Sequence, residues 1–190
     1  MRFADRATAK IPLNIFYLNN NPKVCAEWHV NRHCVKMILE YAQLLSTAHR
    51  CLDGTVTPGY SASGRKKTIY ALSDSRDSVL YSATHVNHPS AVWARQSDFN
   101  YEWLFRMFKA LMEEYTYRYG KIHACGRLAT ALAARPNNIP KGPFTEPTPA
   151  MPEEYKVTSD SITSYKNYYL GAKAHMFAWK NRPTPNWIAE

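Results

Sequence analysis

Acidic residues and glycine are scarce in this chain. Its 190 residues include 15 Asp and Glu against 24 Lys and Arg, and 7 Gly, so the formal net charge is +9. This excess of positive charge favours polyanions as partners, and nucleic acid first. No apolar run reaches the roughly 18 residues that a membrane-spanning helix needs, so we expect no membrane association. An apolar fraction of 45% excludes a chain that is disordered by composition.

Signals for disulfides and for secretion are missing as well. The four cysteines form no CxxC pair and no framework spacing, which predicts reduced and mostly buried thiols. The first ten residues include basic side chains but have no apolar stretch behind them, so we expect no secretory signal. Together these features indicate a cytoplasmic protein.

The short signatures of several enzyme classes are also absent. The sequence contains no GxxxxGKS/T loop, no GxGxxG, no GxSxG and no HExxH. It has neither an RNP motif nor the spacing of a C₂H₂ zinc finger, and no glycine-rich hairpin separates two expected helices as in a helix–hairpin–helix glycosylase. Any enzymatic function must therefore be argued from individual residues.

Glycine and proline divide the chain into expected helices. Both are absent from residues 23–53 and 90–119, and each of these stretches begins next to a proline. Apolar side chains recur at helical spacing in both stretches, which predicts two long helices. Shorter helices are expected at residues 121–134 and 160–180. Only residues 13–18 resemble a strand, and because one short strand makes no sheet we expect a single extended segment there.

These elements predict an all-α protein. We expect a compact single-domain helical bundle at residues 13–190, preceded by an N-terminal arm at residues 1–12. Two long irregular connections join the helices. Residues 54–78 are polar and are predicted to be mobile, whereas residues 136–152 hold six prolines in 17 residues, which predicts an ordered wrap or hinge.

One face of the first long helix has an unusual composition. Steps of 4, 3, 4, 3, 4 and 3 place seven polar side chains on one stripe. A solvated face is normally rich in Lys and Glu, whereas this stripe carries two histidines, a glutamine and a threonine. It is either a plain solvated face or a cleft wall that gathers titratable groups. The stripe consists of His29, His33, Lys36, Glu40, Gln43, Thr47 and Arg50.

Lys36 and Glu40 are one helical turn apart within this stripe. A desolvated lysine beside a carboxylate can act as an amine nucleophile and form a Schiff base with C1′ of a sugar. The competing interpretation is an ordinary ion pair worth a few tenths of a kcal/mol. In the catalytic interpretation, His29, His33 and Gln43 orient the pair.

Histidines offer an alternative in which the protein binds a divalent metal. Two histidines one helical turn apart can share a metal ion, and carboxylates supply oxygen ligands. The candidate ligands are His29, His33, His85 and His88, with Glu27 or Glu40.

Aromatic and basic residues outside the stripe are candidate DNA contacts. Residues 84–103 are dense in side chains that stack on bases or hold phosphates. In the competing interpretation, Trp93 and Trp103 belong to the core and Arg95 pairs with Asp98. Scattered basic residues are normally only solubilising, but with the net charge they form a candidate phosphate-binding surface. The candidate DNA contacts are Gln43, His88, Arg95, Asn100, Tyr101, Arg65, Lys66 and Lys67.

Three segments of the chain resemble a widespread family of small bacteriophage proteins without an assigned function. They are NIFYLNNNPKVCAEWHVNRH, HPSAVWARQSDFNYEWLFRMFKALMEEYTYRYGKIH and MPEEYKVTSDSITSYKNYYLGAKAHMFAWKNRPTPNW. More remotely, the order of elements is similar to that of the endonuclease V type of pyrimidine-dimer DNA glycosylase. The features that carry this likeness are residues 14–18, His29, and residues 88–120, 152–155 and 182–187.

The remote resemblance implies an all-α enzyme that flips a nucleotide out of DNA, cleaves the N-glycosidic bond through an imine and then cuts the strand. In that family the N-terminal amine is the nucleophile, and a helical glutamate stabilises the imine. Here about twelve residues precede the matching segment, and Lys36 lies nearest the glutamate's position, with Glu40 one turn later. We therefore hypothesise that Lys36 supplies the amine and Glu40 the carboxylate.

The leading prediction is a monomeric DNA glycosylase, with or without lyase activity, that acts on damaged or modified bases in duplex DNA and needs no cofactor. One alternative is a His/Glu metal-dependent enzyme that modifies nucleotides or bases. The other is a non-catalytic DNA-binding or phage assembly protein, whose DNA binding would be sensitive to salt. The expected location is the cytoplasm, that of the host cell if a phage encodes the protein.

Overall fold

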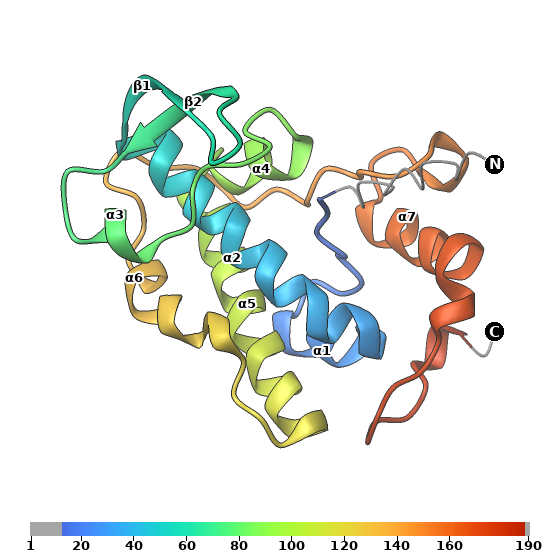
Figure 1. Cartoon of the computed structure of the whole chain (residues 1–190). Coiled ribbons are helices and arrows are strands. Elements are labelled where there is room, and N and C mark those ends of the chain that lie inside the picture. Colours follow the sequence, from blue (N-terminus) through green and yellow to red (C-terminus); the bar gives the residue numbers. More distant parts are fainter. Residues whose placement is uncertain (1–12, 189–190) are drawn as a thin grey trace, which may run out of the picture.

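Two long helices occupy the centre of the molecule. The structure is a computed structural model that describes residues 13–188, so the arm expected at residues 1–12 lies outside the described residues. Helices α2 (Asn31–Asp53) and α5 (Asp98–Tyr119) pack against each other, with α1 (Pro22–Trp28) on α5 and α4 (Pro89–Ala94) on α2 (Figure 1). Their buried apolar side chains form most of the core.

Residues 23–53 form two helices rather than the single one expected. Helix α1 ends at Trp28, and His29 and Val30 are extended before α2 begins. Arg118 of α5 donates hydrogen bonds of 2.8 Å each to the carbonyl oxygens of Glu27 and His29. These carbonyls would otherwise lack partners at the end of α1. A side chain from a distant helix thus stabilises this break, for which the local sequence holds no glycine or proline.

The second long stretch, residues 90–119, is also divided. Helix α4 ends at Ala94, and α5 begins after Ser97, whose hydroxyl accepts a hydrogen bond of 3.2 Å from the backbone amide of Asn100. Serine is a strong N-cap residue, so this boundary has a signal in the sequence that glycine and proline alone do not reveal. Residues 121–134 form a 3₁₀ turn (Ala124–Leu128) and the short α6 (Ala129–Ala133) instead of one helix.

The connection at residues 54–78 contains a β-hairpin, so the fold is mostly helical but not purely all-α. Strand β1 (Thr55–Tyr60) pairs antiparallel with β2 (Lys66–Ala71), in a register that sets Thr55 opposite Ala71 and Tyr60 opposite Lys66. The β-branched and aromatic residues of both strands favour this pairing, which Pro58 and Gly59 obscure in the sequence. The short α3 (Arg76–Val79) follows.

Residues 13–18, the short extended segment expected near the start of the domain, join no sheet within residues 13–188. Helix α7 (Ser161–Tyr168) packs beside this segment. The helix expected at residues 160–180 changes type after α7, first to a π-helical turn (Tyr169–Lys173) and then to a 3₁₀ turn (Ala174–Met176).

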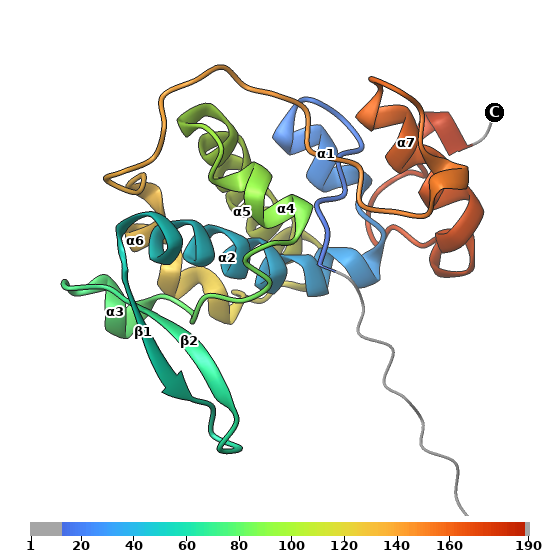
Figure 2. The same ribbon diagram turned by 90° about the horizontal axis from the view of Figure 1, so that it is seen from above.

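The proline-rich residues 136–152 run along the outside of the helices (Figure 2) toward a 3₁₀ turn (Glu153–Tyr155). Trp93 and Asn100 hold this segment by hydrogen bonds to Thr145. A last 3₁₀ turn spans Asn186–Ile188. Among the helices of residues 13–188, none is long and apolar enough to cross a membrane.

Candidate active site

A narrow crevice lies where residues 13–18, helix α2 and the end of α7 meet. Its volume is about 20 Å³, enough for about one water molecule. Two lysines, a glutamate and a histidine line it together with amide, aromatic and thioether side chains. The lining residues are Asn14, Phe16, His33, Lys36, Met37, Glu40, Tyr168 and Lys173.

Lys36 and Glu40 form an ion pair in this crevice, with 3.0 Å between Lys36 Nζ and Glu40 Oε1. The lysine side chain is 38% exposed and that of the glutamate only 10%. The backbone amide of Asn14 donates a hydrogen bond of 3.4 Å to Glu40 Oε2. Burial raises the pKa of Glu40, and its contacts with Lys36 offset this effect only in part. The crevice therefore combines an accessible amine with a carboxylate that takes up a proton more readily than an ordinary glutamate.

His33 forms a neutral wall beside this pair. Its ring is stacked on Phe16, with centroids 4.0 Å apart, and its Nδ1 lies 2.7 Å from the hydroxyl of Tyr169. Burial, reinforced by neighbouring positive charges, lowers the pKa of His33 to about 2. Because the ring stays uncharged at neutral pH, His33 shapes the crevice and does not serve as an acid there.

The π-helical turn after α7 supplies the opposite wall. It places Tyr169 against His33 and leaves Lys173 at the crevice, where Lys173 Nζ lies 4.8 Å from the ring centroid of Tyr168. Single π-helical turns within helices occur frequently at functional sites. Lys173 thus gives the crevice a second positive charge. In the sequence it is one of three lysines, Lys166, Lys173 and Lys180, that recur every seven residues in the last expected helix.

Asn14 joins three distant segments at the crevice. Its Nδ2 donates to the carbonyl oxygen of Ala150 at 2.8 Å, and its Oδ1 accepts a hydrogen bond of 2.7 Å from the Tyr165 hydroxyl. Sequence reasoning missed Asn14, Phe16 and Tyr168 as crevice residues. A polar residue within the apolar run LNIFYL was the available signal for Asn14.

The remaining residues of the predicted stripe have other surroundings. His29 is completely buried, with Nδ1 2.7 Å from the carbonyl oxygen of Cys25 and Nε2 2.8 Å from the Tyr41 hydroxyl. Thr47 contacts the backbone of Thr84, and Arg50 binds backbone carbonyls around the hairpin. Gln43 is half-buried. The stripe is therefore a cleft wall only around His33, Lys36 and Glu40, and His29 lies behind that wall.

The histidines of the metal alternative are not gathered into a cluster. His88 Nδ1 accepts a hydrogen bond of 3.1 Å from the backbone amide of Ser90 and caps α4. His85, which has a positive φ of 48°, places its Nδ1 2.7 Å from Thr84 Oγ1. Within residues 13–188 there is no group of three or more His, Cys, Asp or Glu side chains arranged to hold a metal ion.

Most of the candidate DNA contacts at residues 84–103 have structural partners. The Asn100 side chain is buried and bonds Trp93 and Thr145, while the Tyr101 hydroxyl donates to Leu132 and lies 2.8 Å from His49 Nε2. Arg95 donates to the carbonyl oxygen of Ala91 rather than pairing with Asp98. The ion-pair partner of Asp98 is Arg135. As the alternative interpretation predicts, Trp93 and Trp103 belong to the core.

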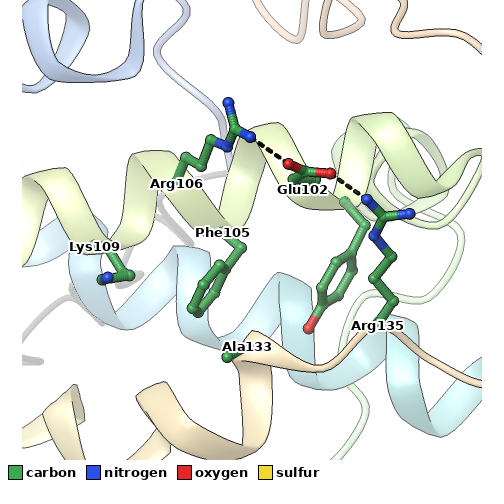
Figure 3. Close-up of a pocket in the computed structure, with 7 residues that line it drawn as sticks. Glu102, Phe105, Arg106, Lys109, Ala133 and Arg135 are labelled. Carbon is green, nitrogen blue, oxygen red and sulfur yellow. Dashed lines mark hydrogen bonds and ion pairs between the residues drawn. The ribbon is translucent and has the colours of Figure 1, made fainter.

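A wider hollow of about 350 Å³ lies along α5 beside α6 (Figure 3). Glu102 there pairs with both Arg106 and Arg135, so its carboxylate sits between two guanidinium groups. Arginine side chains stay protonated in proteins, so the carboxylate of Glu102 faces two permanent positive charges and not an amine that could pass it a proton. Although larger, it is the weaker candidate for catalysis.

No protein-family model, curated protein or solved structure matches this chain. The resemblance to bacteriophage proteins and to pyrimidine-dimer glycosylases stays a prediction. The function is therefore argued from the geometry of the crevice.

Proposed function

We propose that the chain is a DNA-processing enzyme in which the Lys36 amine attacks C1′ of a deoxyribose, giving N-glycosylase activity on damaged or modified bases together with strand cleavage. The observation that supports this proposal is the Lys36–Glu40 pair, in which a partly exposed amine lies 3.0 Å from a buried carboxylate. The proposed chemistry needs no cofactor, because the amine itself forms the covalent intermediate.

Proton transfer prepares the amine. Lys36 gives a proton to Glu40, whose raised pKa favours the protonated carboxyl. The neutral amine then bonds to C1′, the C1′–N bond breaks, and its electron pair leaves with the base, which takes a proton from the attacking nitrogen. Glu40 next protonates O4′, and the sugar ring opens to an iminium at Lys36 Nζ. The ionised Glu40 can then accept a C2′ proton as the 3′-phosphate departs.

The size of the crevice limits where the substrate binds. A volume of about 20 Å³ holds one water molecule but no nucleobase, so the base stays outside and C1′ approaches Lys36 from its exposed side. Lys173, at the same crevice, is suited to hold an adjacent phosphate. We therefore expect strand cleavage at abasic sites to be faster than release of an intact base.

Borohydride trapping on duplexes that carry an abasic site or a modified base tests this proposal. The wild-type protein should form a covalent adduct with the abasic duplex, and Lys36→Ala should form none. Lys109→Ala, which removes an exposed lysine of α5, is the matched control and should react like the wild type. The proposal is wrong if no duplex gives an adduct with the wild type, and the assignment of Lys36 is wrong if Lys36→Ala still gives the full yield.

A further inference from the structure

The β-hairpin carries a concentrated positive charge at its far end. It projects away from the helices (Figure 2), and Gly64, with φ 75°, lies in the turn between its strands. Arg65, Lys66 and Lys67 are consecutive and exposed, whereas the sequence has no Asp or Glu between Asp53 and Asp74. The hairpin is therefore a purely cationic projection.

The hairpin is anchored firmly at its root. Arg50 of α2 donates five hydrogen bonds, to the carbonyl oxygens of Tyr70, Asp77, Leu80 and Tyr81 and to the Asp77 carboxylate. Arg76 pairs with the two flanking aspartates, Asp53 at 2.6 Å and Asp74 at 2.7 Å. The acidic groups nearest the hairpin are thus neutralised at its root, and the charge at its tip is not balanced locally.

The residue that anchors the root of the hairpin and the glutamate of the crevice belong to the same helix, α2. Arg50 is ten residues after Glu40, and both belong to the polar stripe of this helix. A rise of about 1.5 Å per residue separates the two positions by about 15 Å along the helix axis. This distance equals about four to five base pairs of B-form DNA, at about 3.4 Å each. The six-residue strands carry the tip of the hairpin up to about 20 Å beyond this root, at about 3.3 Å per residue, so a duplex of about ten base pairs is long enough to span from the crevice to the tip.

The shape of the hairpin distinguishes between nucleic acids. On one face Tyr60, which is 66% exposed, stands opposite Lys66, and a hollow of about 500 Å³ lies beside them. The major groove of B-form DNA admits a two-stranded ribbon, whereas that of A-form RNA is too narrow for one. The ribbon shape and the cationic tip together favour duplex DNA.

We propose that the hairpin at residues 55–71 is a DNA-binding ribbon that enters the major groove, with Arg65, Lys66 and Lys67 on phosphates. This proposal rests on the proposed function only for the identity of the partner, which is duplex DNA. Neutralising three phosphates should contribute about 2.7 to the slope of log affinity against log salt concentration, at about 0.9 for each contact. The ribbon would hold DNA against the crevice without taking part in the chemistry.

Fluorescence anisotropy with a labelled DNA duplex, over a series of salt concentrations, tests the ribbon. The variant R65A/K66A/K67A should bind about 100-fold more weakly at about 0.1 M salt and lose 2 to 3 units of salt slope. The control K109A/K121A/K141A removes the same charge from exposed lysines outside the hairpin and should change affinity less than about threefold. Equal losses in both variants would show that only net charge matters and would overturn the proposal.

Chemical footprinting locates the groove. Wild-type protein should protect guanine N7, a major-groove atom, from dimethyl sulfate, and the hairpin variant should not. Protection of adenine N3 alone would place the protein in the minor groove and contradict the proposal. The proposal would also be contradicted if the hairpin variant lost as much affinity for a duplex RNA as for the DNA duplex. If the hairpin variant loses salt slope but the wild-type protein forms no covalent adduct, the DNA-binding ribbon is supported and the proposed chemistry is wrong.

Discussion

Two ion pairs, one on each central helix, have the same i,i+4 spacing but very different surroundings. Arg118 and Glu114 on α5 lie 2.7 Å apart, with side chains only 0% and 4% exposed. Lys36 and Glu40 on α2 lie 3.0 Å apart, with side chains 38% and 10% exposed. The other N–H groups of Arg118 donate hydrogen bonds to the carbonyl oxygens of Glu27 and His29 and to the side chain of Asn31. Lys36 keeps a partly exposed amine.

The carboxylates of the two pairs shift in opposite directions. Burial raises the pKa of Glu40, because the single ammonium of Lys36 does not offset the loss of solvation. Burial alone would also raise the pKa of Glu114, but hydrogen bonds from Arg182 and Arg118 together lower it. The number of cations facing a buried carboxylate therefore decides whether it serves as a fixed charge or as a proton acceptor.

Removing the arginine of the buried pair should have the largest effect on stability. Arg118→Ala leaves Glu114 without one of its two cations and leaves two backbone carbonyls unpaired, so we expect a loss of about 3–5 kcal/mol. Urea denaturation monitored by tryptophan fluorescence measures it, with Arg32→Ala, an exposed arginine of α2, as control. A decrease in the free energy of unfolding of less than about 1 kcal/mol would show that this buried pair contributes little to stability.

Neutralising the carboxylate of the Lys36–Glu40 pair should lower the rate of adduct formation and not the stability of the fold. Glu40→Gln keeps the shape of the side chain but cannot accept the proton of Lys36, so we expect single-turnover adduct formation to slow about 100-fold, equivalent to about 2.7 kcal/mol. Glu113→Gln, on the exposed side of α5, serves as control. An unchanged rate in Glu40→Gln would remove Glu40 from the chemistry.

The two pairs each have a buried histidine nearby that makes the fold sensitive to acid. Burial lowers the pKa of His29 to about 4 and that of His33 to about 2, against about 6.5 in the unfolded chain. The unfolded state therefore binds protons first, and stability that is complete above pH 6.5 is lost as the pH falls, toward 4 for His29 and toward 2 for His33. Between pH 7 and pH 5 each histidine should cost about 2 kcal/mol, while the raised pKa of Glu40 acts in the opposite direction.

Urea denaturation of His29→Gln and His33→Gln at both pH values separates these contributions. Each variant should show a pH dependence smaller by about 2 kcal/mol than that of the wild type. If both variants keep the full wild-type dependence, the acid sensitivity originates elsewhere.

The smallest expected effect is that of Lys36 on stability. Because the Lys36 ammonium is partly exposed, and because Glu40 with its raised pKa can take up a proton when that ammonium is removed, Lys36→Met should change the free energy of unfolding by less than about 1 kcal/mol. Comparison with Arg118→Ala then separates a pair that stabilises the fold from one that is available for chemistry. A loss as large as that of Arg118→Ala would remove the distinction between them.

The sequence predicts the helices better than their ends. Apolar periodicity indicates the helical parts of residues 23–53 and 90–119, because burial of one face is a local pattern. The break at His29 depends on Arg118, which is 89 residues away, and no local signal could reveal it. The hairpin was missed for a different reason, since Pro58 and Gly59 interrupt an otherwise strand-like β1 whose pairing tolerates both.

The candidate site is predictable only where it lies on one helix. The spacing of His33, Lys36 and Glu40 places them on one face of α2, and all three line the crevice. His29 follows the same spacing but lies beyond the helix, in the extended link after α1, which turns its ring into the core. Tyr168 and Lys173 lie more than a hundred residues away along the chain, so only the packing of α7 brings them to the site.

The positions of the crevice residues along the chain determine how late in protein synthesis the site can form. Its walls include Asn14 near one end of the described chain and Lys173 near the other. A nascent chain emerging from the ribosome can form α2 and α5, whose contacts are nearer in sequence, long before Lys173 has been synthesised. The site is therefore assembled last, and a chain that ends before residue 173 lacks the second lysine of the crevice.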